Sequence, residues 1–551
     1  MSGNTVADLL LARVGDTRPG MMSREATWTW DEVVAASAAR AELARARRID
    51  GPFHIGVLLD NVPEYVFWLG AAALAGATVV GINPTRGDAE LEQEVAQTDC
   101  QFVVTDRAGA AMLSGLDIGV PPERYLLIDR PGYADEVAAH AEPPRRDPGV
   151  TDRTRMLLLF TSGTTGASKA AICSQGRLAR LGERNSSKYR VDADDVCYCP
   201  MPLFHGNALM ALWAPALTAG ACVALTPKFS ASRFLDDVRL FGATFFTYVG
   251  KAIGYILAQP ETDDDADNPL THAFGTEASP EDRTTFLRRF GCRLYEGYGS
   301  SESAGMLRMV EHAPTGSLGV AAKDSVWIVD PDTLVACPAA VLDEYGRVCN
   351  ADEAVGEIVD TAGAATFEGY YNNESANAEK LRNGWYWTGD RGYTDVDGYF
   401  YFAGRSGDWI RVDGENVSAL LIERVVRRHP AVVAAAAFAV PDARSGDQVM
   451  VAVELDGSVP FEDLGFADFL SRQQDLGAKG TPRYVRVSSA LPTTGSGKLR
   501  KKEMAAAAWR TTDAVYQRSG RDATGYTRLA AAGRQALHEE FRAHGRQRFL
   551  P

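Results

Sequence analysis

The chain of 551 residues has few of the features that mark secreted, metal-binding or nucleic-acid-binding proteins. Its eight cysteines are scattered and form no CxxC unit, so reduced thiols of a cytoplasmic protein are expected rather than a disulfide framework or a metal site. Positive charge is in deficit, with 57 Lys and Arg against 72 Asp and Glu. The net charge of −15 disfavours nucleic acid and anionic lipid as main partners.

Long apolar segments are also scarce. The N-terminus has no basic stretch followed by a long apolar core, so no signal peptide is expected. The uncharged stretches Tyr65 to Pro84 and Gly206 to Pro227 approach membrane-span length, but each divides into a helix-like and a strand-like part. We therefore expect buried α/β segments, no transmembrane span, and at most peripheral membrane contact.

The first half of the chain alternates short apolar runs with amphipathic ones. Strands are predicted from His54, Ala77 and Gln101, with a helix over Asn61 to Ala75. This rhythm is typical of parallel α/β sheets. It resumes with strands from Ala221, Ala243 and Arg293 and helices over Ala231 to Phe241 and Pro280 to Phe290.

After about residue 400 the pattern changes to short strands around two helices, which predicts a smaller α+β domain. The expected helices are Ser418 to His429 and one beginning near Phe461, with strands at Val432 to Val440 and Val449 to Leu455.

A loop rich in glycine and hydroxyl groups, Thr161 to Lys169, follows the apolar strand MLLLF. Backbone N–H groups, hydroxyls and a lysine suit polyphosphate binding. The spacing Gly163-xx-Gly166-xx-Lys169 does not match the Walker pattern GxxxxGK[ST]. Alone, the loop is as compatible with a flexible surface turn as with a phosphate site.

Further motifs follow this loop in order: PLFHGN from Pro202, YEGYGSSES from Tyr295, WYWTGD from Trp385, YFAGRSGDWIRVDGENVSALLIE from Tyr401 and LPTTGSGKLRKKEM from Leu491. With them the chain resembles the adenylate-forming superfamily of acyl-CoA synthetases, luciferases and peptide-synthetase adenylation domains. The similarity covers about residues 25 to 505 and is nearest the long and very-long-chain fatty-acid–CoA ligase branch of actinobacterial type.

The resemblance implies an α/β fold. It consists of a large N-terminal domain of parallel α/β sheets with a small barrel-like subdomain, and a smaller mobile α+β C-terminal domain. The implied boundaries are residues 1–404 for ATP and acyl binding, a hinge at 405–408, and 409–551 for the catalytic lysine and the CoA loop.

The resemblance also implies the ATP site. The loop would hold the β- and γ-phosphates, Tyr298 would stack beside adenine, and Asp390 and Arg405 would grip the ribose. Family members often have Thr where Ser301 stands, a departure that keeps the hydroxyl. The full ATP/AMP-binding set is Thr161, Ser162, Gly163, Thr164, Thr165, Gly166, Lys169, Gly275, Thr276, Glu277, Gly297, Tyr298, Gly299, Ser300, Ser301, Asp390, Arg405 and Lys498.

Four residues are assigned catalytic roles by the same resemblance. Lys498 would bridge the substrate carboxylate and the α-phosphate, where an ammonium stabilises developing charge. Glu302 would bind Mg²⁺, and Thr161 belongs to the phosphate loop. His205 matches an aromatic position that gates the carboxylate pocket, although a buried structural histidine is the competing interpretation.

Thioester formation would follow a rotation of the C-terminal domain. Gly414, Glu415 and Asn416 would then line the pantetheine tunnel of coenzyme A. The hinge position, commonly Asp or Lys in the family, is Gly407 here and is followed by Asp408. Glycine can absorb the change in backbone dihedrals, although it lacks the side chain that the family usually has at this hinge.

The acyl pocket is predicted around His205, Tyr248, Val249 and Gly250. Its acid is expected to be medium or long, or bulky and hydrophobic, as fatty, steroid or terpenoid acids are. A carrier-protein thiol or an amine remains an alternative acceptor, and a nucleotide or acyl-AMP sensor is the alternative without catalysis. ATP, Mg²⁺ and coenzyme A are the implied cofactors, and monomer and homodimer both stay open.

Overall fold

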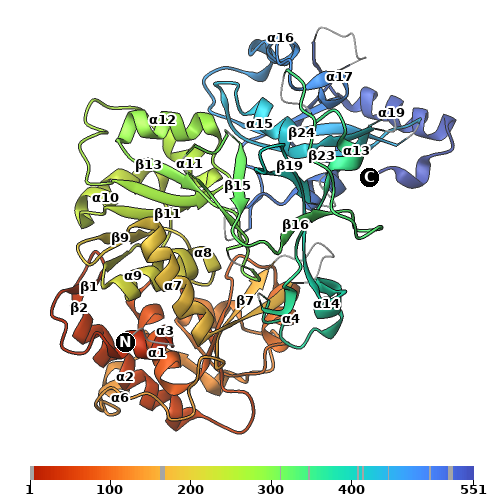
Figure 1. The fold of residues 1–551 in the computed structure, drawn as a ribbon. Coiled ribbons are helices and arrows are strands. Elements are labelled where there is room, and N and C mark those ends of the chain that lie inside the picture. Colours follow the sequence, from red (N-terminus) through yellow and green to blue (C-terminus); the bar gives the residue numbers. More distant parts are fainter. Residues whose placement is uncertain are drawn as a thin grey trace. The chain divides into compact units, whose positions relative to one another are not determined.

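The computed structural model describes residues 5–161, 168–303, 305–310, 312–314, 316–344, 348–365, 367–405, 409–412, 415–444, 446–494, 498–518 and 525–551. The chain forms two compact units (Figure 1). Unit 1 comprises Met1–Ala278, Arg283–Met306 and Thr361–Tyr386, and unit 2 comprises Ser279–Asp282, Leu307–Asp360 and Trp387–Pro551. These units are defined by packing, whereas the predicted hinge at 405–408 concerns a rotation between domains. The hinge therefore stays a prediction.

Unit 1 contains two sheets that are mostly parallel, as the sequence predicted. The seven-stranded sheet runs β13-β12-β11-β9-β10-β1-β2, with only the β1–β2 pair antiparallel. Its strands are β1 (Pro19–Met22), β2 (Thr27–Thr29), β9 (Val196–Cys199), β10 (Cys222–Leu225), β11 (Phe245–Val249), β12 (His272–Thr276) and β13 (Arg293–Glu296).

The six-stranded sheet runs β6-β5-β3-β4-β7-β8. Its strands are β3 (His54–Leu58), β4 (Thr78–Gly81), β5 (Cys100–Thr105), β6 (Tyr125–Leu127), β7 (Arg155–Thr161) and β8 (Lys169–Ser174). The last pair is antiparallel, with Thr161 opposite Lys169. The glycine-rich loop therefore joins two strands of a hairpin, whereas a Walker loop leads from a strand into a helix.

The helices of unit 1 pack on these sheets around an apolar core that includes Trp68 and Trp213. Helix α2 begins with a capping box, since Thr29 accepts from the Glu32 N–H and Glu32 accepts from Thr29. The helices are α1 (Val6–Leu11), α2 (Trp30–Arg47), α3 (Pro63–Ala75), α4 (Asp88–Ala96), α5 (Arg107–Met112), α6 (Tyr133–Ala138), α7 (Gln175–Tyr189), α8 (Gly206–Ala208), α9 (Ala214–Ala219), α10 (Phe234–Phe241), α11 (Gly250–Leu257), α12 (Pro280–Phe290) and α14 (Glu374–Lys380).

One predicted helix begins later than expected. Helix α3 starts at Pro63, which suits a first helical position, rather than at Asn61. Asn61 is buried, and its amide donates to the carbonyls of Cys199 and Met201 and accepts from the Leu203 N–H at 2.8 Å. Asn61 thus ties the six-stranded sheet to the start of the PLFHGN segment.

Unit 2 contains an antiparallel sheet, a hairpin and a mixed five-stranded sheet. The first sheet runs β14-β15-β20-β19-β17-β16 and corresponds to the expected small subdomain, and the five-stranded sheet runs β23-β24-β25-β26-β27. The strands are β14 (Leu307–Arg308), β15 (Ser317–Ala321), β16 (Val326–Val329), β17 (Gly356–Asp360), β19 (Trp385–Thr394), β20 (Phe400–Arg405), β21 (Trp409–Val412), β22 (Glu415–Ser418), β23 (Val432–Pro441), β24 (Asp447–Leu455), β25 (Tyr484–Ser488), β26 (Ala514–Gln517) and β27 (Thr527–Arg528). The short strand β18 (Leu381–Arg382) and the first two residues of β19 belong to unit 1.

The helices of unit 2 are α13 (Ala351–Ala354), α15 (Ala419–Val426), α16 (Phe466–Ser471), α17 (Gly477–Gly480), α18 (Lys501–Ala507) and α19 (Ala531–Ala543). The stretch predicted as a helix from Phe461 is a 3₁₀ turn followed by α16. Within the part of the chain that the structure describes, no helix combines the length and apolarity that a membrane crossing requires.

Candidate active site

The carboxyl ends of β11, β12 and β13 lie side by side and bring three predicted site segments together. Tyr248 is opposite Gly275, and Gly275 is opposite Glu296. A Cβ on Gly275 would lie 2.4 Å from the Tyr248 carbonyl oxygen and 2.5 Å from its ring, so only glycine fits there. Carboxyl ends of parallel strands are the usual place for ligands in α/β sheets.

The turn after β13 presents Ser301 and Glu302. The Ser300 N–H donates to the Ser303 carbonyl at 3.0 Å, and the Ser303 N–H donates to the Ser300 hydroxyl at 3.1 Å. These bonds close a turn with Ser301 and Glu302 at its tip. The predicted residues Gly297, Tyr298 and Gly299 connect β13 to this turn.

Glu302 is buried, with 8% of its surface exposed, and is held by two hydroxyl groups. Thr161 donates to Oε1 at 2.9 Å and Tyr370 donates to the same oxygen at 3.0 Å. Burial alone would raise the pKa of Glu302, but the charge of Lys380 and these two hydroxyls lower it below its ordinary value. The carboxyl group is therefore ionised at neutral pH.

This carboxylate suits a magnesium ion that is bound together with nucleotide phosphates. Mg²⁺ usually binds through one or two carboxylates, with phosphate oxygens and water completing its shell. Across the described residues, no group of three or more His, Cys, Asp and Glu side chains forms a metal cage, and this mode of binding requires none. The ionised oxygens of Glu302 next to the end of the glycine-rich loop fit that role.

Lys169 lies at the other end of the loop, buried and paired. Its Nζ is 3.2 Å from Glu379 and 5.5 Å from the centre of the Tyr370 ring. Only 6% of the lysine side chain is exposed, against 52% for Glu379. The cation expected to meet phosphates is thus held by an exposed carboxylate that a more highly charged anion can displace.

The PLFHGN segment reaches both the turn and the strand ends. His205 is the N-cap of α8, and its Nδ1 accepts from the Asn207 N–H at 3.3 Å. The Asn207 amide donates to the Tyr248 carbonyl at 3.2 Å, which links α8 to the end of β11. A Cβ on Gly206 would lie 2.9 Å from the Ser301 hydroxyl. His205, Tyr248 and Ser301 therefore belong to one cluster in unit 1.

The remaining predicted residues of unit 1 complete the strand ends. Thr276 closes β12, Glu277 follows it with a φ of +74°, and Val249 closes β11. Gly250 opens α11, where a Cβ would lie 1.9 Å from the Glu277 carbonyl oxygen. The β11 and β12 ends are thus in direct backbone contact at this glycine.

Asp390, Arg405 and Lys498 all lie in unit 2. Asp390 and Arg405 are directly opposite each other on the antiparallel strands β19 and β20. Asp390 is 8% exposed, and its N–H donates to the Thr388 hydroxyl. The Lys498 N–H donates to the Thr494 hydroxyl at 3.1 Å and its carbonyl accepts from the Thr494 N–H at 2.7 Å.

The loop residues Ser162, Gly163, Thr164, Thr165 and Gly166, the hinge residues Gly407 and Asp408, and the tunnel residue Gly414 lie outside the described residues. The backbones of Glu415 and Asn416 belong to β22 and pair with Val412 and Arg411. The roles of all predicted site residues stay predictions.

Sequence reasoning did not single out four residues of this cluster: Tyr370, Lys380, Arg177 and Glu296. Tyr370 and Lys380 are at least 68 residues from Glu302 in sequence, and only the fold brings them near it. Arg177 donates to the Ser301 carbonyl at 2.8 Å. Burial raises the pKa of Glu296 to about 7, although the Tyr248 hydroxyl and the Ala278 N–H donate to its carboxyl group.

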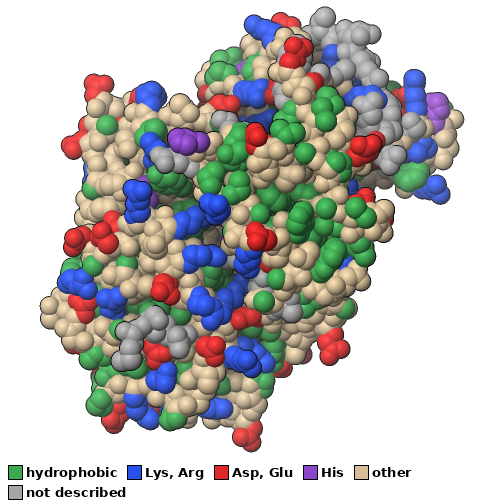
Figure 2. Space-filling model, viewed as in Figure 1, with side chains coloured by type: hydrophobic (Ala, Val, Ile, Leu, Met, Phe, Trp, Pro, Cys, Tyr) green, Lys and Arg blue, Asp and Glu red, His purple; other side chains and the backbone are tan. Residues whose placement is uncertain are grey.

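Positive side chains are concentrated in one region, although the protein as a whole has a negative net charge. Lys and Arg side chains gather where α7 and α8 lie (Figures 1 and 2). Arg180, Arg184 and Lys188 are exposed along α7. Such a region attracts the anionic substrates that the motifs imply.

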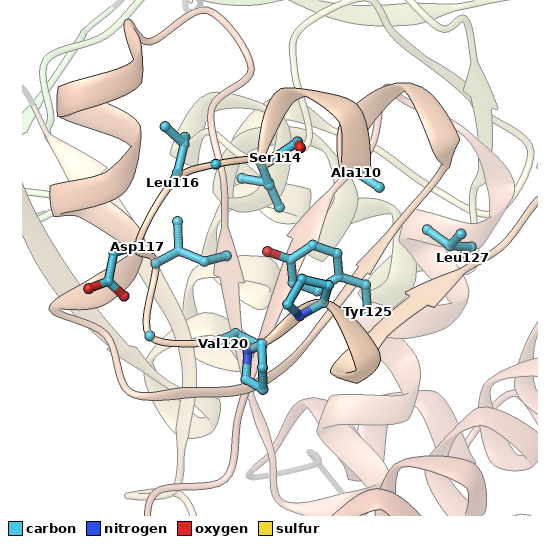
Figure 3. A pocket seen from close by; sticks show the side chains of 13 residues that line it. Ala110, Ser114, Leu116, Asp117, Val120, Tyr125 and Leu127 are labelled. Carbon is cyan, nitrogen blue, oxygen red and sulfur yellow. The ribbon is translucent and has the colours of Figure 1, made fainter.

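A cavity of about 850 Å³ lies elsewhere, between α5 and β6 (Figure 3). Its lining is mostly apolar and includes Leu113, Leu116, Val120 and Tyr125. All of its lining residues fall between Ala110 and Leu127, so it contains none of the predicted site residues.

Comparison with known families defines the class of this protein. Residues 12–371 match the family described as AMP-binding enzyme, and residues 421–498 match the AMP-binding enzyme C-terminal domain. The chain belongs to the AMP-binding enzyme family. The predicted resemblance, the α/β fold class and the reaction class, an acid–thiol ligase that uses ATP, Mg²⁺ and coenzyme A, are confirmed.

Among curated relatives, the steroid-22-oyl-CoA synthetase of Rhodococcus jostii (strain RHA1) is 60% identical over 547 residues, covering 99% of both chains. The medium/long-chain-fatty-acid–CoA ligase FadD17 of Mycobacterium tuberculosis is 42% identical over 513 residues, covering 93% of this chain and 98% of the relative.

Solved structures share the fold at lower identity. An anthranilate CoA ligase in complex with anthranoyl-AMP superposes with a TM-score of 0.81 at 19% identity, covering 92% of this chain and 97% of that one. ATP-bound MatB from Rhodopseudomonas palustris gives a TM-score of 0.76 at 22% identity, covering 91% and 98%.

Proposed function

We propose that this protein activates a bulky, hydrophobic carboxylic acid of steroid side-chain type and transfers its acyl group to coenzyme A. The observation that carries the proposal is the 60% identity, over 99% of both chains, to a steroid-22-oyl-CoA synthetase. A medium- or long-chain fatty acid is the second candidate, supported by the 42% identity to a fatty-acid–CoA ligase.

In the first step, a carboxylate oxygen attacks the α-phosphorus of ATP and pyrophosphate leaves. Two anions must approach, so neutralising charge and aligning the groups lower the barrier. The loop from Thr161 to Lys169 would hold the phosphates, Lys498 would screen the attacking carboxylate, and Asp390 with Arg405 would hold the ribose. Mg²⁺ at Glu302 would neutralise phosphate charge.

In the second step, the thiol of coenzyme A attacks the acyl carbonyl carbon, and AMP leaves with the electron pair of the mixed-anhydride bond. We infer that residues 409–551 rotate about Gly407 and Asp408 between the steps. The rotation would exchange Lys498 for the Gly414, Glu415 and Asn416 loop. The first half-reaction needs Lys498 at the acyl carboxylate, and the second needs coenzyme A at the same group. This difference supports a rotation that exchanges one for the other.

The acyl pocket would lie beyond the ends of β11 and β12. Tyr248 and Val249 are buried there, and Gly250 leaves no side-chain volume next to Glu277. His205, on the neighbouring turn, would gate the pocket. We also propose a cytoplasmic location, because six of the eight cysteines are buried thiols without a disulfide, as in a reducing compartment.

The decisive test is mass-spectrometric detection of products from ATP, Mg²⁺, coenzyme A and a panel of acids. The panel runs from acetate through palmitate to steroid and diterpenoid acids. A thioester of a steroid acid, formed at higher kcat/KM than palmitoyl-CoA, supports the proposal. Preference for palmitate would favour the second candidate. Acyl-adenylate without thioester would point to a carrier-protein thiol or an amine as acceptor.

A further inference from the structure

Helix α7 carries a buried arginine that contacts the turn bearing Glu302. Arg177 lies in the first turn of the helix and is 8% exposed. Its Nη2 donates to the Ser301 carbonyl at 2.8 Å, and its Nη1 donates to the Ile172 carbonyl at 3.0 Å. Burying a guanidinium is costly unless its donors are bonded, so these contacts restrict where its head group can lie.

The bond to Ser301 acts on Glu302 through the main chain. The Ser301 carbonyl belongs to the peptide group that links Ser301 to Glu302, and peptide groups are planar. The hydrogen bond to that carbonyl therefore orients the peptide plane that contains the Glu302 Cα, to which the side chain is attached. The hydroxyls of Thr161 and Tyr370 then hold the carboxylate itself.

A second arginine of the same helix contacts the far side of the turn. Arg184 is seven residues after Arg177, two helical turns along the same face. A Cβ on Gly305 would lie 1.8 Å from its Nη1, and the φ of Gly305 is +83°. Helix α7 therefore lies against both ends of the Ser301–Gly305 segment.

The position of α7 is itself tied to Tyr370. The Ser174 hydroxyl caps the helix by accepting from the Arg177 N–H, and it donates to Glu368 at 2.6 Å. The Ser174 N–H also donates to Glu368 at 2.6 Å. Since Glu368 is two residues before Tyr370, the helix start, the turn and the Tyr370 segment form one closed set of contacts.

We propose that Arg177 is a positioning residue for adenylation, holding the Ser300–Ser303 turn so that Glu302 meets the magnesium–nucleotide complex in a fixed orientation. This inference rests on the proposed function. Arg177 touches main-chain carbonyls rather than the reacting atoms, so its effect should fall on nucleotide affinity and adenylation and spare acyl transfer.

The test compares three variants of the full chain. Arg177→Met removes both donors at similar volume, and Arg177→Lys keeps the charge with a different donor geometry. Arg107→Met, at an exposed position in the first turn of α5, is the matched control. The measurements are the affinity for Mg²⁺·ATP by calorimetry, KM for ATP in pyrophosphate release, and transfer of a supplied acyl-adenylate to coenzyme A.

Arg177→Met is expected to weaken Mg²⁺·ATP binding and raise KM for ATP about tenfold, the loss of one good hydrogen bond. KM for coenzyme A in the second half-reaction should stay within about twofold. The values for Arg177→Lys should lie between those of Arg177→Met and the parent, and Arg107→Met should match the parent. If Arg177→Met is unstable, the comparison with the parent is made with Arg177→Lys.

Two results would overturn the inference. One is unchanged ATP affinity in folded Arg177→Met. The other is equal loss in both half-reactions without recovery in Arg177→Lys, which indicates a general structural role. If the parent binds Mg²⁺·ATP but activates no acid, the proposed function fails, whereas the calorimetric comparison still decides the role of Arg177.

Discussion

The carboxyl group of Glu296 lies in a buried position that disfavours its ionised form. This residue ends β13, beside Gly275, and burial raises its pKa to about 7. The Tyr248 hydroxyl, the Ala278 N–H and the charge of Arg283 favour the ionised form without offsetting that burial. Near neutral pH this group therefore titrates next to the predicted acyl pocket.

Glu296→Gln should make the protein more stable at alkaline pH. Below about pH 4.5 the folded and unfolded chains both carry the proton. Between that pH and about 7 the unfolded chain ionises first, so the folded state of the parent loses stability as pH rises. The difference in unfolding free energy between variant and parent should grow by roughly 2–3 kcal/mol from pH 4.5 to 8, as measured by denaturant titration.

Glu183→Gln, at an exposed position on α7, is the control for the removal of one carboxyl group. A difference between Glu296→Gln and the parent that stays constant over this pH range would refute the prediction.

Among the elements, the sequence predicted strands β3, β4, β5, β7, β10, β11 and β13 of the two parallel sheets, because their apolar runs are short, bounded by polar residues and separated by helical patterns. It did not predict β1, β2, β6 and β8. It could not predict that β8 returns antiparallel to β7, since pairing direction is a tertiary choice. Nor could it assign Asn61, which lies outside α3 and bonds to carbonyls about 140 residues away.

The family resemblance assigned Glu302 and Thr161 to the same ATP and Mg²⁺ site, and the structure has their side chains in contact. It did not reveal Arg177 or Tyr370, because each acts through a contact formed only on folding. Arg177 bonds to a main-chain carbonyl, which every residue type has, so the identity of Ser301 does not indicate the contact. Burial, which decides the pKa of Glu296, is likewise a property of the packed strands rather than of its motif.

Gly250→Ala should disturb the junction of β11 and α11. The added methyl group would lie 1.9 Å from the Glu277 carbonyl oxygen, which is backbone and cannot rotate away. Overpacking of this kind costs about 1–3 kcal/mol, so Tm should fall and KM for the acid should rise. Thermal melting and acid titration at saturating ATP measure both.

The matched control is Gly87→Ala. Gly87 has an ordinary φ of −72° and open space around its missing side chain. Equal effects of the two substitutions would show that the contact with Glu277 is not the cause.

For the whole molecule, the proposed exchange of half-reactions predicts that they can be separated by mutation. Lys498→Ala should lower the rate of acyl-adenylate formation by at least about a hundredfold, because the ammonium that screens the two anions is lost. Transfer of a supplied acyl-adenylate to coenzyme A should persist. Loss of both activities would contradict the role assigned to Lys498.

Gly414→Trp should have the opposite effect. An indole in the predicted pantetheine tunnel should block thioester formation and leave pyrophosphate release nearly intact. Arg444→Trp, at an exposed position of unit 2, is the control for a new surface indole. An unchanged thioester yield in Gly414→Trp would show that this loop does not line the pantetheine tunnel.

The loop proposed to bind the nucleotide phosphates is anchored at both ends in the β7–β8 hairpin. Thr161 and Lys169 are opposite each other in the β7–β8 ladder, so the span that the intervening residues must bridge is set by the sheet. Lengthening a segment with fixed end points costs only about 0.6 kcal/mol per doubling. We therefore expect changes in the length of this loop to alter its proposed phosphate affinity with little change in the melting temperature of the surrounding sheet.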